Sequence, residues 1–218
     1  MAHSRQNKWL ANCLFLFICT LVPIESVHSE EPQEKTAQQA AATALKVGDQ
    51  AIDGVLIDGA GKEVQLSDLW KEGPLVVIWY RGGWCPICMR HLRGIQEAMP
   101  QIKEAGAKIV AIAPELPEMS KQTAEKNGFD FLLLSDKGNT LGEKYGIVFK
   151  LDPGTATRYQ QLFDLEKFNG DASMELPVPV AYVINEKGVI TFAYVEPDYR
   201  QRVKPGDIVD ALKTTPAN

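Results

Sequence analysis

Cysteine and histidine are the scarcest reactive residues of this sequence. Its 218 residues contain four cysteines and three histidines. Cys13, Cys19, His3 and His28 all lie before residue 30, so only Cys85, Cys88 and His91 remain beyond it. A structural zinc site built from four cysteine or histidine ligands therefore lacks ligands in the larger part of the chain.

Basic charge and long apolar runs are also in short supply. Lysine and arginine number 23 against 28 acidic residues, which gives a net charge of −5 at pH 7. No stretch is basic enough to predict binding to nucleic acid or to an anionic membrane surface. The long apolar run from Leu10 to Ile24 is too short to span a bilayer comfortably.

Residues 1–29 are typical of an export signal. Arg5 and Lys8 precede the apolar run, and Val27-His28-Ser29 places small or branched residues ahead of a cleavage site. We expect cleavage after Ser29 and a periplasmic or secreted protein. The alternative is an uncleaved membrane anchor.

The rest of the chain is predicted to form one α/β domain. Residues 30–46 are rich in Glu, Gln and Ala, and we expect a flexible N-terminal segment there. Residues 47–215 have the length of one domain with a full core. The turn residues Gly59-Ala-Gly61 predict a β-hairpin formed by residues 55–58 and 63–66.

Strands and helices alternate beyond this hairpin. Strands are predicted at 75–80, 108–113 and 129–134, with one helix beginning at Pro86 and another at 117–127. This βαβ order predicts parallel strands with helices on the faces of the sheet.

The last third of the chain has a different pattern. A second hairpin (180–184 and 189–195) and a helix (205–212) are predicted to close the domain. Residues 151–176 show no strand pattern, although 155–167 could be helical. A connection of this length predicts a lid, a contact surface or a plain surface insertion.

The pair Cys85-Pro-Ile-Cys88 allows four interpretations: a structural disulfide, part of a metal site, a haem anchor or a reactive dithiol. A disulfide that closes about four residues contributes roughly 2 kcal/mol, against about 4.7 for a hundred-residue loop. Haem attachment requires histidine directly after the second cysteine, where Met89 stands. A copper site of Cys85, Cys88 and His91 remains conceivable.

The local sequence favours the reactive dithiol. The pair stands where a buried strand ends and a helix begins, and a helix N-terminus stabilises a thiolate. Arg81 and Arg90 add positive potential, and Trp84 can shield the first sulfur. We expect Cys85 to be the more exposed sulfur that attacks a substrate, and Cys88 to be the buried resolving thiol.

Trp84-Cys-Pro-Ile-Cys88 resembles the Trp-Cys-x-x-Cys site of thioredoxin-fold proteins. From about Leu45 to Leu212, the chain resembles the peroxiredoxin-like branch of the alkyl hydroperoxide reductase and thiol-specific antioxidant family. The stretches that carry the resemblance are Leu45-Lys-Val-Gly-Asp49, Leu66-Ser-Asp-Leu69, Tyr80-Arg-Gly-Gly-Trp-Cys-Pro86, Phe168-Asn-Gly-Asp171, Leu176-Pro-Val-Pro179 and Val195-Glu-Pro-Asp-Tyr199.

The resemblance implies a thioredoxin-like α/β fold: a central mixed sheet with an N-terminal β-hairpin and flanking helices, plus an insertion near 151–176. It implies that Cys85 and Cys88 are catalytic and that Arg81, Trp84 and Pro179 bind the substrate. A cis peptide bond is expected before Pro179, in the position where thioredoxins have one facing the dithiol.

The sequence departs from the family patterns around the dithiol. Laid onto Cys88, the peroxiredoxin pattern Pro-x-x-x-Thr-x-x-Cys places Arg81 at its proline and Cys85 at its threonine. Residues 177–181, before the late hairpin, contain no arginine, and residues 75–80 contain no acid. Glu115 is expected in a solvated loop, with a proton acceptor as the alternative. His91 is expected at the surface, with a role beside a thiolate as the alternative.

These features predict an exported thiol–disulfide oxidoreductase or peroxiredoxin-like antioxidant enzyme without a cofactor. The expected partners are a thiol or disulfide protein and a small hydroperoxide or disulfide. No nucleic acid is expected, and no membrane contact except through an uncleaved signal. The alternatives are a copper-binding accessory protein that uses Cys85, Cys88 and His91, and a structural domain whose dithiol is unused.

Overall fold

The structure is a computed structural model that describes residues 34–214, so the predicted signal peptide and its cleavage site lie outside the described residues. The helices are α1 (Ala37–Thr43), α2 (Leu66–Lys71), α3 (Pro86–Glu104), α4 (Pro117–Asn127), α5 (Thr140–Lys144), α6 (Pro153–Phe163), α7 (Leu165–Asn169) and α8 (Pro205–Thr214), with a short 3-10 helix η1 (Lys137–Asn139). The strands are β1 (Val55–Asp58), β2 (Glu63–Gln65), β3 (Leu75–Trp79), β4 (Lys108–Ala113), β5 (Leu132–Ser135), β6 (Val148–Lys150), β7 (Glu175–Pro177), β8 (Val180–Ile184) and β9 (Ile190–Val195).

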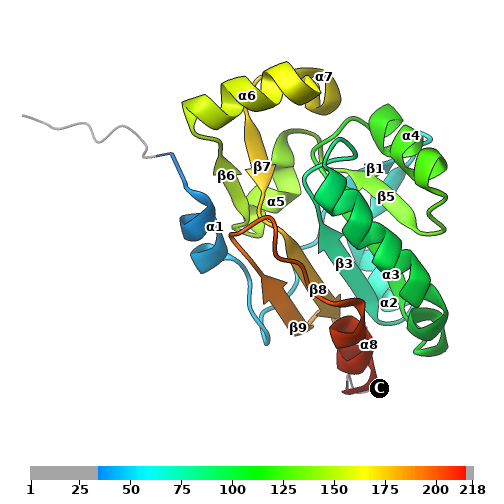
Figure 1. Cartoon of the computed structure of the whole chain (residues 1–218). Coiled ribbons are helices and arrows are strands. Elements are labelled where there is room, and N and C mark those ends of the chain that lie inside the picture. Colours follow the sequence, from blue (N-terminus) through cyan, green and yellow to red (C-terminus); the bar gives the residue numbers. More distant parts are fainter. Residues whose placement is uncertain (1–33, 215–218) are drawn as a thin grey trace, which may run out of the picture. The chain divides into compact units, whose positions relative to one another are not determined.

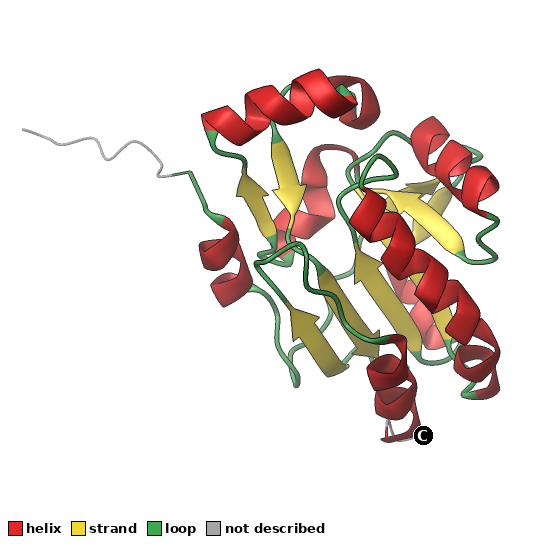
Figure 2. Cartoon of the chain, viewed as in Figure 1, coloured by secondary structure: helices red, strands yellow, loops and turns green. Residues whose placement is uncertain are grey.

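Seven of these strands form one mixed sheet in the order β2-β1-β5-β4-β3-β8-β9. β3 runs parallel to β4 and antiparallel to β8, and β4 runs parallel to β5. The central strand β3 is buried along its whole length, because helices cover both faces of the sheet (Figure 2). This is the predicted thioredoxin-like arrangement.

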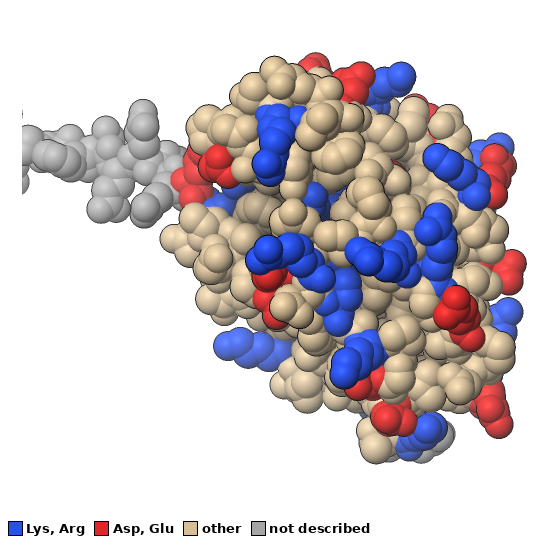
Figure 3. Space-filling view, in the orientation of Figure 1, with Lys and Arg blue, Asp and Glu red and all other residues tan. Residues whose placement is uncertain are grey.

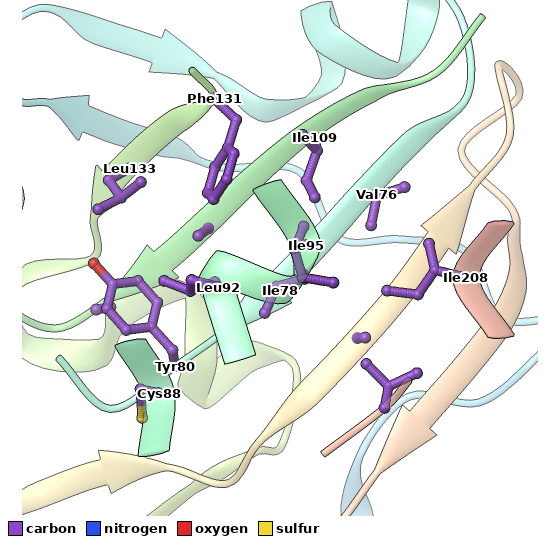
Figure 4. Close-up of a cluster of buried hydrophobic side chains, with 14 of the residues drawn as sticks. Val76, Ile78, Tyr80, Cys88, Leu92, Ile95, Ile109, Phe131, Leu133 and Ile208 are labelled. Carbon is purple, nitrogen blue, oxygen red and sulfur yellow. The ribbon is translucent and has the colours of Figure 1, made fainter. Parts of the chain in front are cut away.

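Figure 1 shows helices on both sides of the sheet, and the buried hydrophobic side chains form a separate core on each side. Val76 and Ile78 of β3 face a core shared with α3 and α8, which also contains both cysteines. Figure 4 shows Cys88 at one end of this dithiol core, in line with Leu92 and Ile95. The alternate residues of β3 face the second core, the tyrosine core, whose large members include Trp79, Tyr145 and Tyr182.

Most elements predicted from the sequence are confirmed. Both hairpins form around their glycine turns, and α4 ends at Gly128, whose left-handed φ of 65° suits a residue without a side chain. The described helices contain none with the length and hydrophobicity that a membrane span requires.

Two segments contain more structure than the sequence indicated. Within residues 151–176 the predicted helix is present as α6 and is followed by α7, whereas β7 at their end, which pairs with β6 as a separate two-stranded sheet, was not predicted. Residues 37–43, within the segment expected to be flexible, form α1 with a Thr36/Gln39 capping box. Ala40 of this helix is fully buried in the tyrosine core, because alanine lets the helix lie close against its neighbours.

Candidate active site

The junction between β3 and α3 positions the two cysteines. Cys85 is the N-cap of α3, and its sulfur accepts a hydrogen bond of 3.3 Å from the backbone N–H of Cys88. The first N–H groups of a helix have no partner within the helix, so this sulfur satisfies one of them. Pro86 follows at the first helical position, where the missing N–H costs nothing.

The two sulfurs form one closely coupled pair. Both cysteines are free thiols, and their Sγ atoms lie 2.6 Å apart with a thiol proton hydrogen-bonded between them. Cys85 is only 2% exposed and Cys88 is fully buried. Cys85 is the more exposed of the two, as predicted, but only slightly, because both cysteines belong to a hydrophobic core that also contains Leu151, Tyr159 and Leu165 of the insertion.

An arginine far along the chain reaches the deeper sulfur. Nη2 of Arg202 donates to the Cys88 sulfur at 3.3 Å, and its Nη1 donates to the backbone carbonyls of Tyr199 and Gln201. These carbonyls hold the guanidinium in place. No sequence pattern singled out Arg202, although this residue lies three positions beyond the Val195–Tyr199 stretch that carries the family resemblance.

The pKa values of the two thiols shift in opposite directions. Burial raises the pKa of Cys88, but the hydrogen bond with Cys85, the Arg202 guanidinium and the backbone N–H and charge of Arg81 outweigh it and lower the pKa to about 6. The hydrogen bond with Cys88 and burial raise the pKa of Cys85 above that of an ordinary thiol. The electrostatics thus favour a thiolate at Cys88, whereas the sequence pointed to Cys85 as the attacking sulfur.

Arg81 and Trp84 pack together under the insertion. Arg81 is 3% exposed, and its guanidinium carbon lies 5.0 Å from the centroid of the Trp84 ring. Trp84 in turn packs against Phe163 and Tyr159 of α6, with centroid distances of 4.9 and 5.5 Å. These contacts place α6 over the two predicted substrate-binding residues nearest the dithiol.

Glu115 is fully buried, so its expected place in a solvated loop is wrong. Its carboxylate accepts hydrogen bonds from the Tyr80 hydroxyl at 2.6 Å and from the Gly83 N–H at 2.8 Å. Burial raises the pKa of Glu115, and the nearby Cys88 adds to that direction while its three hydrogen-bond donors oppose it. Glu115 follows directly after the buried strand β4, and nothing in the sequence indicated that this loop folds into the interior.

His91 is half-buried and does not face the cysteines as a metal ligand would. Its Nε2 lies 3.1 Å from the Val203 carbonyl, which can only accept, so this nitrogen carries the proton. Burial and the Arg202 charge lower the pKa of His91 to about 4. Within residues 34–214 no group of three or more potential metal-binding side chains comes together, so the structure gives the copper alternative no support.

Pro179 lines a cavity together with Arg81, but its preceding peptide bond is trans, and the prediction of a cis bond is wrong. The chain passes through this point in extended form. Pro177 pairs within β7, Val178 donates to the Ile147 carbonyl, and the Pro179 carbonyl accepts from Glu196 beside β9. Hydrogen bonds on both sides of the proline thus hold the extended trans backbone.

The fold and the site define a thioredoxin-like protein with a buried dithiol at a strand-to-helix junction. The profile of the AhpC/TSA family matches residues 47–193, which is more than half of the chain. The chain therefore belongs to the AhpC/TSA family.

Curated relatives bear either a disulfide-exchange or a peroxiredoxin name. The thiol-disulfide oxidoreductase ResA of Halalkalibacterium halodurans is 31% identical over 103 residues, which are 47% of this chain and 57% of ResA. The peroxiredoxin Bcp of Escherichia coli is 33% identical over 103 residues, which are 47% of this chain and 65% of Bcp. The chain thus matches less than two thirds of the length of each.

Solved peroxiredoxin structures share the fold. The peroxidoxin BcpB of Mycobacterium tuberculosis superposes with a TM-score of 0.63 at 20% identity, over 79% of this chain and 99% of BcpB. At this level of identity the match establishes the thioredoxin-like architecture.

Proposed function

We propose that this protein is an exported thiol-dependent oxidoreductase that cycles Cys85 and Cys88 between dithiol and disulfide. The observation that carries the proposal is the Arg202 guanidinium, 3.3 Å from the sulfur of Cys88, beside a second thiol 2.6 Å away. A cation in contact with one thiol stabilises its thiolate, which is the reactive form. A second thiol within bonding reach allows the oxidised product to be resolved within the same chain.

With a hydroperoxide, the Cys88 thiolate attacks the terminal oxygen, the O–O bond breaks, and the alkoxide leaves and takes up a proton. Cys88 becomes a sulfenic acid and the peroxide becomes an alcohol. The Cys85 thiol then condenses with the sulfenic acid, which releases water and forms the Cys85–Cys88 disulfide. Two equivalents of an external thiol restore the dithiol and are themselves oxidised to a disulfide.

With a disulfide substrate the same pair performs an exchange. The thiolate forms a mixed disulfide and expels one thiolate, and the second cysteine then displaces the other. The substrates proposed are small hydroperoxides or disulfides, with a thiol or disulfide protein as redox partner. Arg81, Trp84 and Pro179 are proposed to contact the substrate beside the dithiol.

Export is proposed from the signal-like residues 1–29, with a periplasmic or secreted destination. An exported dithiol meets an oxidising compartment, so its cycle depends on a reductant supplied there. Expression in a bacterial host, fractionation and N-terminal sequencing of the product test this point. A product that begins at residue 30 in the exported fraction supports it, and a full-length cytoplasmic product contradicts it.

The redox activity is tested with the full reduced chain and single cysteine variants. Hydrogen peroxide or a small disulfide should be consumed in the presence of dithiothreitol, and Cys85→Ser and Cys88→Ser should each lose at least about 100-fold in turnover. After substoichiometric oxidant, dimedone trapping in Cys85→Ser should label Cys88, and Cys88→Ser should be labelled far more slowly at Cys85. Equal turnover of both variants and the parent would overturn the proposal.

A further inference from the structure

Arg81 is a buried cation without a carboxylate partner. It is 3% exposed, and no carboxylate within residues 34–214 forms an ion pair with it. Its Nη2 donates to the Tyr159 hydroxyl at 3.0 Å, while its Nε is buried without any hydrogen bond. Burying a charge is costly unless an opposite charge pairs with it, so the desolvation cost of this guanidinium is not offset by an ion pair.

Aromatic rings around the guanidinium offset only part of this desolvation cost. The guanidinium carbon lies 4.1 Å from the centroid of the Tyr199 ring, 5.0 Å from that of Trp84 and 5.1 Å from that of Tyr159. Each ring attracts the cation through the negative face of its π-system. Rings on several sides hold the guanidinium in a fixed position but neutralise none of its charge.

A cavity of about 280 Å³ adjoins this arginine. We call it the Arg81 pocket. Its walls include Arg81, Phe149, Lys150, Tyr159, Pro179 and Tyr199. The pocket lies below the roughly 300–1,000 Å³ typical of drug-sized ligands, which restricts it to a small molecule.

The other charges at this pocket are already engaged. Lys150 is paired with Glu34 at 2.6 Å. Asp152 caps α6 by accepting the Thr155 N–H at 3.0 Å. Lys150 and Asp152 are exposed to solvent, as are most of the charged side chains visible in Figure 3, so Arg81 is the buried charge at this pocket that no ion pair balances, within the part of the chain that the structure describes.

We propose that the Arg81 pocket binds a small organic carboxylate, whose charge pairs with the Arg81 guanidinium and whose apolar part lies against Phe149, Pro179 and Tyr199. The guanidinium presents a planar fork of donors that matches a carboxylate. In the disulfide state of the proposed cycle neither sulfur carries a charge, so the ligand is then the anion that Arg81 lacks. Resting on the proposed function, the carboxylate belongs to a small thiol or disulfide that reacts at Cys85 and Cys88.

Binding is tested without any redox chemistry, by calorimetry on the full chain with Cys85→Ser and Cys88→Ser. Benzoate is the probe, and benzamide, which has the same shape without the charge, is the comparison. We expect benzoate to bind at least tenfold more tightly. Arg81→Gln in this background should abolish the preference, while Arg93→Gln, an exposed arginine of α3, should keep it.

A second variant covers the case in which Arg81→Gln does not fold. Thr155→Trp introduces a large side chain from the half-exposed face of α6 into the pocket and should block benzoate binding without touching Arg81. Equal affinities for benzoate and benzamide would overturn the proposal. Benzoate affinity unchanged in both Arg81→Gln and Thr155→Trp would overturn it as well.

Turnover then identifies the reactant that carries the carboxylate. The reductants 3-mercaptopropionate and 2-mercaptoethanol are compared, and so are their disulfides as oxidants. A kcat/KM preference of about tenfold or more for the carboxylate compound supports the inference, and it identifies the reactant as the thiol or the disulfide according to the comparison in which it appears. No preference in either comparison contradicts the inference. Benzoate binding without any thiol or disulfide turnover would instead overturn the proposed function and leave the carboxylate site standing.

Discussion

The two cores on opposite faces of the sheet differ in what their polar groups do. In the tyrosine core, the hydroxyls of Tyr145 and Tyr182 donate to the carbonyls of Ile52 and Leu45 at 2.9 and 3.0 Å. The dithiol core borders two thiols of opposite pKa shift, a buried carboxyl and an unpaired guanidinium. The tyrosine core holds neutral polar groups, including the buried and unpartnered Nε1 of Trp79, whereas the dithiol side holds charge that its own residues do not fully balance.

Because of this difference, we expect substitutions on the face of the tyrosine core to change stability, and substitutions on the face of the dithiol core to change the chemistry. Alternate residues of β3 face opposite cores, so a substitution on this strand acts on one side or the other. Of the four buried side-chain polar atoms without a partner in residues 34–214, the Arg81 Nε and the Trp84 Nε1 lie beside the dithiol, and the others are the Trp79 Nε1 in the tyrosine core and the Asn169 Oδ1 in α7. The unpaired charge of Arg81 marks the dithiol side as the one where a ligand or reactant is expected.

Trp79→Ala should give the largest loss of stability and leave the chemistry unchanged. Trp79 is 2% exposed and its ring centroid lies 4.6 Å from that of Tyr145. Removing it should reduce the free energy of unfolding by about 3–5 kcal/mol, measured by urea denaturation. The Cys88 titration, followed by thiolate absorbance at 240 nm, should not move. Trp79→Phe provides a milder version, and a shifted titration in either variant would mean that the two cores are not independent.

Glu115→Gln should cost stability on the dithiol side in a pH-dependent way. The amide oxygen can still accept from Tyr80 and Ser120, but its NH2 group places donors where Oε2 accepts from the Gly83 N–H, at a cost of about 1–3 kcal/mol. Because the folded pKa of Glu115 is raised, its carboxyl contributes stability that is fully present below its ordinary value of 4.5 and is lost as pH rises through the folded value. The variant should therefore be less stable than the parent at pH 4.5, and the difference should narrow as pH rises. Exposed Glu118→Gln should show no such trend, and a difference that widens with pH would contradict the burial argument.

Arg202→Gln should change the chemistry with little effect on stability. Loss of the guanidinium should raise the pKa of Cys88 from about 6 by roughly 1–2 units. The midpoint of thiolate absorbance reports this shift directly, whether or not the substitution also opens access to the sulfur. Arg200→Gln, an exposed arginine paired with Asp198, is the matched control and should leave the midpoint in place. An unmoved midpoint in Arg202→Gln would show that Arg202 does not hold the thiolate.

Tyr182→Phe should produce the smallest effect. It removes one hydrogen bond to the Leu45 carbonyl and no packing, so about 0.5–1.5 kcal/mol of stability should be lost. Turnover and the Cys88 midpoint should match the parent. A loss of activity larger than the loss of folded protein would place this tyrosine in the chemistry.

Local patterns predicted the fold well and the site only in part. Glycine turns, apolar strands and the proline at the start of α3 act over a few residues, so both hairpins, α4 and the position of the dithiol were predictable. Arg202 and Glu115 reach the surroundings of the dithiol from segments distant in sequence, and the periodicity of a sequence does not predict contacts between distant segments. The trans bond before Pro179 depends on hydrogen bonds to Ile147 and Glu196, which also come from afar. Cys85 is buried in a core that includes Leu151, Tyr159 and Leu165, and the sequence did not show that the insertion contributes to this core.

The burial of both sulfurs has a consequence for the time course of the proposed reaction. With Cys85 2% exposed and Cys88 fully buried, a reactant reaches a sulfur only when the residues packed around the dithiol move apart, so the rate of that opening sets an upper limit on turnover. At low oxidant concentration the rate should rise in proportion to concentration, and at high concentration it should level off at the rate of opening. Oxidants of very different intrinsic reactivity would then share one maximal rate, set by the opening and not by the thiolate.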